Sequence, residues 1–499
     1  MDQPSPLPKN KYAITYVFSF LVRKEKHLLD QMKNFGWRDD KEPYSVDQRF
    51  RITRYFSSTA SKLYLNDVRY FSLARFSGLC VADAPELSSR IEKCRVLIFP
   101  GSIGCSVGQL HLSIESEGLG EGADRLCDLH ERLRAWSNSF SEGGEPKGAS
   151  ALHFRRSDGG SNEYFDPDDF DADLNVKVSA LLTFLLGGTS ASGSAFDKVV
   201  DPVCDRRSPA LIFASTDKAN VNSDEFLYRL IAGDGSGSPL PSSSYVRSFL
   251  ANREASPYFG KGVSPTVASR SAIDGYGFVL IGGIENAFFN NVIYSSFQSI
   301  YSILFSLLWY QYAFLLNSLE RLEQISENAG DPHSKDVEEV VKDIGRYLNP
   351  SLLSFGSREE QALLLLEIGQ RTLGIDKLYE KLDRQAAYWH NYSVTVETRS
   401  TANAAVIIGL LSVLGLVVSV LFGVADLNGV GSADGSPLRN MVRALVGVSV
   451  AGFIGLFFLG FFSTRNPKGF LRSIAIFYLL PYVIFLGAFT VAVWLSFSS

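Results

Sequence analysis

Apolar and polar positions along the chain follow two periodicities, and the first is that of a β-strand. Up to about residue 275, short apolar runs alternate with turn-rich stretches, and several runs place apolar residues at every second position. The runs that predict strands are 96–104, 109–116, 210–215 and 276–283. Helical spacing occurs within 163–186 and over 124–137. This mixture predicts an α/β or α+β domain.

The apolar segment 12–22 is too short to cross a bilayer, and Arg23 and Lys24 follow it at once, so it predicts a buried strand or a short helix. No cleavable signal peptide is apparent, and the N-terminal domain is expected to stay in the cytosol. Three polar stretches are expected to be flexible surface loops: 141–160, 187–194 and 233–244.

From residue 290 the spacing becomes helical. Apolar residues recur at intervals of three and four over 290–328, which predicts one long helix, and its aromatic content predicts burial against other helices. Polar Gln298, Gln311 and Asn317 argue against a membrane crossing there. Further helices are predicted over 335–347 and from Ser357, where Glu360 completes a capping box.

After a break near Gly374, Asp376 can cap a helix that meets no Pro or Gly before Gly409. The simplest interpretation is a single helix that leaves the cytosol and becomes a membrane span. Spanning a bilayer takes ~20 mostly apolar residues. Three segments are that long, and the predicted organisation is a cytosolic domain over 1–275, a helical stalk over 276–400 and an all-α transmembrane domain over 401–499, with two to three spans at 403–424, 441–462 and 470–497.

Charge fixes the expected orientation. The chain carries a net charge of −5, and its acidic first 400 residues give no electrostatic reason to expect nucleic-acid binding. Arg465, Lys468 and Arg472 lie between the second and third spans, so this loop is expected on the cytoplasmic side and the C-terminal Ser499 outside. A multi-pass protein of the cell inner membrane is predicted, with a cytoplasmic N-terminal domain.

Residue types that form catalytic, metal or phosphate sites in other proteins are scattered along this chain. The five cysteines contain no C-x-x-C pair and read as reduced structural thiols. His111, between two leucines, is expected on the strand face opposite to them. The acidic stretch 166–173 lacks the Gly and closing Glu of a calcium loop, and the glycine-rich stretches 101–108 and 233–238 lack the lysine of a P-loop. No catalytic site is predicted, so the chain is not expected to be an enzyme.

The helix that enters the membrane has one small or polar face and one aliphatic face. The first stripe consists of Thr395, Thr398, Ala402, Ala405, Gly409, Ser412, Leu416, Ser419, Gly423 and Asp426, and the opposite one of Val406, Leu410, Val413, Val417, Val420 and Val424. Small and hydroxyl side chains either let helices pack closely or line water. Close packing without a pore therefore stays open beside a pore lining. In a symmetric assembly a ring of Asp426 would concentrate cations; the alternative is a solvated loop carboxylate.

The last 200 or so residues resemble the CorA-type metal-ion transporters, especially their divergent bacterial branch. The resemblance lies in the helix compositions of 299–322 and 346–382 and in the run into the first span. It implies a homopentamer, a long stalk helix continuous with a pore-lining first span, and a second span packed outside.

The resemblance also implies a filter, and here the chain departs from the family. The family carries Gly-Met-Asn after an aromatic residue at the outer end of the first span, where the Asn ring binds the hydrated ion. The matching positions are Phe422, Gly423, Val424 and Ala425, so the amide is missing. Asp426 and Asn428 would complete a less selective pore mouth, with Asp426 as the metal-binding residue. A third span containing Pro481 is a second departure.

Three hypotheses follow. The first is a CorA-like homo-oligomeric channel that conducts cations, with Mg²⁺ or another divalent ion as transported or regulatory ion and no other cofactor. The second is a membrane effector of a bacterial stress or defence system, opened by a cytosolic ligand or a protein activator. The third is a membrane-anchored scaffold that conducts nothing.

Overall fold

The computed structural model describes residues 10–82, 84–101, 105–115, 122–134, 139–140, 146–147, 151–166, 180–187, 199–203, 208–255, 269–327, 342 and 360–429. The chain forms two compact units, Met1–Ala387 and Tyr388–Ser499, and each is described by itself. The first unit continues well past residue 275, where the sequence places the end of the first domain, because strands and helices beyond that point pack on its sheet.

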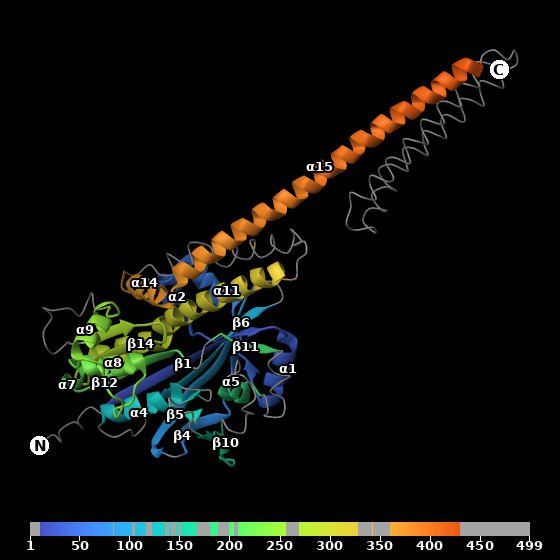
Figure 1. Cartoon of the computed structure of the whole chain (residues 1–499). Helices are drawn as coiled ribbons and strands as arrows, with labels where there is room; N and C mark the ends of the chain where they lie inside the picture. The colour runs from blue at the N-terminus through green and yellow to red at the C-terminus, as the bar shows by residue number, and fades with distance from the viewer. Residues whose placement is uncertain are drawn as a thin grey trace, which may run out of the picture. The chain divides into compact units, whose positions relative to one another are not determined.

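A large mixed sheet forms the centre of the first unit (Figure 1). Within the described residues its main path runs β10-β9-β4-β5-β6-β1-β12-β14-β13, and the pairing is antiparallel except between β12 and β14. The strands are β1 (Lys11–Val22), β2 (Arg38–Asp39), β3 (Arg69–Ser72), β4 (Phe76–Val81), β5 (Ala84–Phe99), β6 (Ser106–Glu115), β9 (Leu152–Arg156), β10 (Glu163–Phe165), β11 (Val200–Pro202), β12 (Ala210–Thr216), β13 (Ser269–Ile273) and β14 (Gly277–Gly283), with a separate β7 (Ser139–Phe140) and β8 (Pro146–Lys147) pair.

One face of the sheet holds the main hydrophobic core. Alternate residues of β1, among them Ile14, Tyr16 and Phe18, point into it. The helices that cover this face are α1 (Glu25–Phe35), α4 (Ala123–Arg134), α5 (Ala180–Leu185), α8 (Asp224–Ala232) and α9 (Ser243–Ala251), with the short α7 (Lys218–Val221) beside them. Segment 12–22 is thus a strand, and it is buried because both of its faces are covered.

A long helical segment covers the other face. It consists of a π-helical turn η5 (Phe289–Ile293), α10 (Tyr294–Ser296), a second π-helical turn η6 (Phe297–Tyr301) and α11 (Ser302–Glu327). The prediction of one long helix over 290–328 is confirmed in the described part, but its partner is different. The segment packs mainly on β1 and β6 rather than only on helices, because the second sheet face also needs an apolar cover.

Smaller helices complete this layer. They are α2 (Val46–Tyr55), α3 (Ser58–Lys62), the π-helical turn η1 (Leu63–Asp67) and α14 (Glu360–Leu373). Among the described residues, one helix, Phe289–Gln324, is long and apolar enough to cross a membrane, and 83% of its apolar window is buried inside the protein. That burial is typical of a core helix.

Helix α15 (Ile375–Gly429) begins directly after Gly374, whose φ of +68° breaks the chain away from α14. It is continuous over 55 residues, so the prediction of one uninterrupted helix is confirmed. One detail was wrong: Asp376 lies in the first turn of the helix and is not its cap. The helix extends beyond the predicted end of the span at 424, so Asp426 and Asn428 lie within it. The predicted helix 335–347, apart from Lys342, and the spans 441–462 and 470–497 lie outside the described residues.

Two further expectations are corrected. The helix expected within 163–186 is confirmed in part by α5, while residues 163–165 form β10, and the stretch 141–160, expected to be a flexible loop, contains β9. The stretch 233–244, expected to be flexible, is held by hydrogen bonds to helix α4. The Ser236 amide donates to Asp128 at 2.7 Å and the Ser238 hydroxyl donates to Glu131 at 2.7 Å. Two carboxylates on α4 thus satisfy polar groups that water would otherwise bind.

Candidate functional site

Helix α15 places the predicted pore-lining residues at intervals of three and four, and this spacing puts them on one helix face. Thr395, Thr398, Ala402 and Gly409 are exposed. For the remaining predicted positions the structure describes the helical backbone alone. These are Ser412, Leu416, Ser419 and Gly423 of the lining, and Phe422, Val424, Ala425, Asp426 and Asn428 of the mouth.

The two threonines share a feature that the sequence does not reveal. Thr395 Oγ1 donates to the Asn391 carbonyl and Thr398 Oγ1 to the Val394 carbonyl, each at 2.7 Å. Each hydroxyl proton is therefore used inside the helix. The oxygen lone pairs remain available as acceptors, which suits a surface that meets cations.

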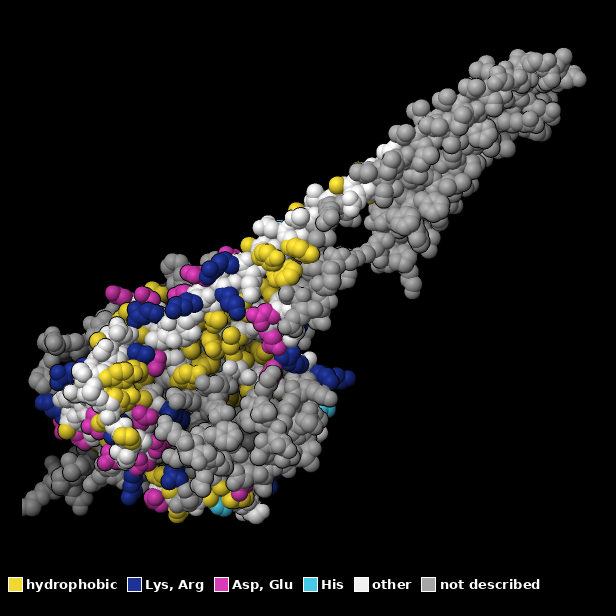
Figure 2. All heavy atoms as spheres, in the orientation of Figure 1, with side chains coloured by type: hydrophobic (Ala, Val, Ile, Leu, Met, Phe, Trp, Pro, Cys, Tyr) yellow, Lys and Arg dark blue, Asp and Glu magenta, His cyan; other side chains and the backbone are white. Residues whose placement is uncertain are grey.

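Three aromatic residues precede this stripe. The ring centroids of Tyr388 and Trp389 are 5.3 Å apart, and those of Trp389 and Tyr392 are 5.7 Å apart. The side chains of Tyr388 and Tyr392 are exposed, by 62% and 39%. Figure 2 shows hydrophobic side chains on the described part of this helix. Exposed aromatic residues of this kind indicate a surface that other helices or lipid cover.

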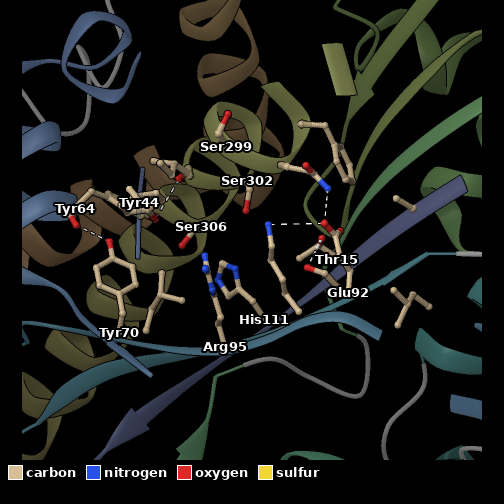
Figure 3. Close-up of a pocket in the computed structure, with 18 residues that line it drawn as sticks. Thr15, Tyr44, Tyr64, Tyr70, Glu92, Arg95, His111, Ser299, Ser302 and Ser306 are labelled. Atoms are coloured by element: carbon tan, nitrogen blue, oxygen red, sulfur yellow. Dashed lines mark hydrogen bonds and ion pairs between the residues drawn. The ribbon is translucent and has the colours of Figure 1, made fainter. Parts of the chain in front are cut away.

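A second candidate site lies inside the first unit, between the sheet and the helical segment 289–327 (Figure 3). The sheet face turned toward this helix is polar at its centre. Thr15 on β1, Lys93 and Arg95 on β5, and His111 and Ser113 on β6 line a cavity of about 50 Å³. Its roof includes Ser302 and Ser306, whose hydroxyls point down toward these strands. We call this group of seven residues and the space between them the polar cleft.

Charges in and beside the polar cleft are unevenly matched. Arg95 pairs with Asp40 at 3.8 Å, a distance too long for a direct hydrogen bond. Lys93 lies 3.8 Å from the carboxylate of its neighbour Glu92. That carboxylate already accepts a hydrogen bond from Gln298 at 2.6 Å. The two cations therefore keep donor capacity that points into the cavity.

The floor of the polar cleft is tied to its roof by a buried network. The Gln109 amide donates to the Ser306 carbonyl at 2.9 Å and accepts from the Ser306 hydroxyl. The same amide oxygen lies 3.2 Å from His111 Nε2. Burial, helped by the Arg95 charge, lowers the pKa of His111 to about 3, so its ring is neutral. In this network the neutral ring donates through Nε2 and leaves Nδ1 as an acceptor.

Tyrosines close one end of the polar cleft. Tyr64 donates to the Ile303 carbonyl at 3.2 Å, and Tyr70 donates to the Tyr64 carbonyl. Burial raises the pKa of both phenols well above the usual value, so both stay protonated donors. The roof at this point is the π-helical turn η6 and the first turns of α11. Such turns often occur at functional sites.

His111 lies on the strand face opposite Leu110 and Leu112, as the sequence predicts. The rest of the polar cleft was missed, because its residues come from three strands and one helix. Among the described residues no group of three or more His, Cys, Asp or Glu side chains could hold a metal ion.

Four of the cysteines, Cys80, Cys94, Cys105 and Cys127, are free thiols, and burial raises the pKa of Cys94 and Cys127 to about 12. Cys204 lies outside the described residues, as does most of the acidic stretch 166–173.

No family model, curated protein or solved structure matches this chain, so the resemblance to CorA-type transporters rests on the sequence patterns alone.

Proposed function

We propose that this chain is the subunit of a CorA-like homo-oligomeric channel that conducts cations across the cell inner membrane under the control of its N-terminal domain. In this proposal no dedicated filter restricts the channel to one ion. The observation that carries the proposal is the uninterrupted helix α15. Its 55 residues correspond to a length of ~80 Å, whereas a span needs ~30 Å. One helix is thus long enough to serve as both stalk and span.

The spacing on α15 supports an arrangement around an axis. The stripe from Thr395 to Asp426 alternates steps of three and four residues, which is a period of 3.5. Helices with this period supercoil with the stripe facing their shared axis. The stripe is small and rich in hydroxyl groups, so several copies would enclose a polar path, while the aliphatic stripe faces lipid or the proposed spans 441–462 and 470–497.

The proposed mouth selects by charge. Phe422, Gly423, Val424 and Ala425 lack the amide that holds a hydrated magnesium ion in the family that the chain resembles. A ring of Asp426, with Asn428 beside it, would attract cations without a snug coordination site. Conduction of both mono- and divalent cations is the expected behaviour, with five subunits as the stoichiometry that the resemblance implies.

Flux through the purified full-length protein in liposomes tests the proposal. Ser412→Phe and Ser419→Phe should block flux, because each places a ring in the proposed lining. Val413→Phe is the matched control on the aliphatic stripe and should conduct. Absence of flux for every cation, or equal loss in all three variants, would contradict a pore along this stripe. The scaffold alternative predicts that the biological output survives Ser412→Phe.

A specific observation favours a second candidate function. The polar cleft gives the N-terminal domain a place where a cytosolic ligand could act directly on a core helix. A poorly selective pore held shut until such a ligand arrives would be a membrane effector of a stress or defence system. Expression of residues 375–499 alone tests this candidate: toxicity of the inserted fragment supports it, and harmless insertion contradicts it.

A further inference from the structure

We propose that the polar cleft binds a small oxyanion, a phosphate group or one of similar charge and size, with Lys93 and Arg95 as its cationic partners. Both residues lie on β5 and, two positions apart, point to the same side of the sheet. The side chains are 38% and 29% exposed, so the cations are partly withdrawn from water yet reachable from it. This site goes beyond the proposed channel and does not depend on it.

The hydrogen-bonding capacity of the two cations favours an anion. An arginine carries five N–H donors, and the carboxylate of Asp40 is 3.8 Å away from the guanidinium of Arg95. Glu92 also lines the cavity, where it accepts a hydrogen bond from Gln298 at 2.6 Å and lies 3.8 Å from Lys93, too far for a direct hydrogen bond. Guanidinium groups bind phosphate and carboxylate oxygens in a bidentate manner. The cleft thus offers more donors than its own acceptors satisfy.

The neutral groups around the cations fit the same ligand. Ser302, in the first turn after η6, points its hydroxyl into the space above Arg95 (Figure 3). His111 contributes no charge, and its Nε2–H group is held by Gln109. A protonated oxyanion, such as monohydrogen phosphate, could donate to the remaining ring nitrogen.

The size of the cavity limits which ligands fit. A cavity of about 50 Å³ has room for roughly three to five water molecules. A phosphate or carboxylate group fits this space, whereas sites for whole organic ligands are usually ~300 Å³ or larger. A nucleotide would therefore enter with one phosphate end at most.

Calorimetric titration of the full-length protein in detergent with inorganic phosphate tests the site. Acetate serves as the carboxylate probe, and chloride at equal ionic strength controls for screening. Phosphate should bind, and Arg95→Gln and Lys93→Gln should each weaken binding at least about tenfold through loss of a charged hydrogen bond. Arg90→Gln is the control on the same strand, because Arg90 pairs with Glu115 at 3.0 Å and is outside the cleft. No phosphate binding, or equal weakening by Arg90→Gln, overturns the proposal.

A second variant separates lost binding from lost folding. Ser302→Leu keeps both cations, suits a helix and fills the cavity, so it should abolish phosphate binding while the thermal unfolding of the protein stays close to that of the parent. Unchanged phosphate affinity in this folded variant would place the anion elsewhere and overturn the proposal. Because binding is measured without flux, failure of the channel proposal leaves the result interpretable.

Discussion

Gln109 is predicted to hold the helix α11 onto the sheet, and Gln109→Leu should loosen that helix selectively. The amide makes three contacts in the buried network: two with Ser306 and one with His111. Gln109 and Ser306 are both fully buried, so water does not replace a lost partner without cost. Leucine has a similar size and removes the polar contacts while it keeps most of the packing.

The expected magnitude follows from these contacts. A typical hydrogen bond contributes about 1 kcal/mol net, and a buried group left without a partner costs about 1–3 kcal/mol. The Ser306 hydroxyl can turn back to its own helix, which recovers part of the loss. We expect the free energy of opening of α11 to fall by about 3 kcal/mol. This corresponds to an equilibrium constant for opening that is larger by roughly 100-fold.

Hydrogen exchange of the full-length protein in detergent, followed by mass spectrometry, measures the free energy of opening of individual helices. Peptides from α11 should lose protection, while peptides from α8, on the other face of the sheet, should not. Ser113→Ala is the matched control, because the Ser113 hydroxyl contacts Thr15 at 2.9 Å on the same sheet face and not the helix. Unchanged protection of α11, or an equal loss in α8, would refute a local attachment through Gln109.

The remaining predictions concern the sheet domain. Gly108→Ala should lower the unfolding free energy by about 1–3 kcal/mol in a denaturant titration, because its Cβ would lie 2.1 Å from the buried ring of Phe20; an unaltered midpoint would show that the ring can move aside. Stability should fall as the pH drops from about 6.5 toward 3, because burial lowers the pKa of His111 and His130 to about 3 and the unfolded chain takes up protons first. Each histidine contributes at most about 1.4 kcal/mol per pH unit, so His130→Phe should flatten the slope, and an unchanged slope would contradict this assignment. Peptide mapping after thiol alkylation should find Cys94 and Cys127 unmodified in the folded protein and Cys80 modified before either of them; early labelling of Cys94 would argue against its burial.

Much of the sheet could be predicted from the sequence because alternation is a local signal. The strands β6, β12 and β14 match the predicted runs closely, and the break at Gly374 is a glycine with positive φ. The long helix before it was also predicted, but periodicity does not say which surface a helix covers. The aromatic face of that helix packs on a sheet, where Tyr310 stacks on Phe99 at 4.7 Å.

The polar cleft could not be predicted in the same way. Lys93, Arg95 and His111 each occupy an ordinary alternating position, and polar residues at such positions usually face solvent. Only the register of β5 against β6, which places Arg95 opposite His111, brings them together. The cover that turns this solvent-like face into an interior comes from a helix about 200 residues further along the chain.

The polar cleft between helix and sheet has a mechanical consequence. Where Phe99 meets Tyr310, rings interlock, and any displacement must unlock them together. Around the polar cleft the two layers meet through separate hydrogen bonds, such as those between Gln109 and Ser306, which can open one at a time. The helical segment is therefore held by packed rings on both sides of the polar cleft, at Phe213 and at Phe99, and by single hydrogen bonds between them, so its middle is the part that can shift with the least loss of packing.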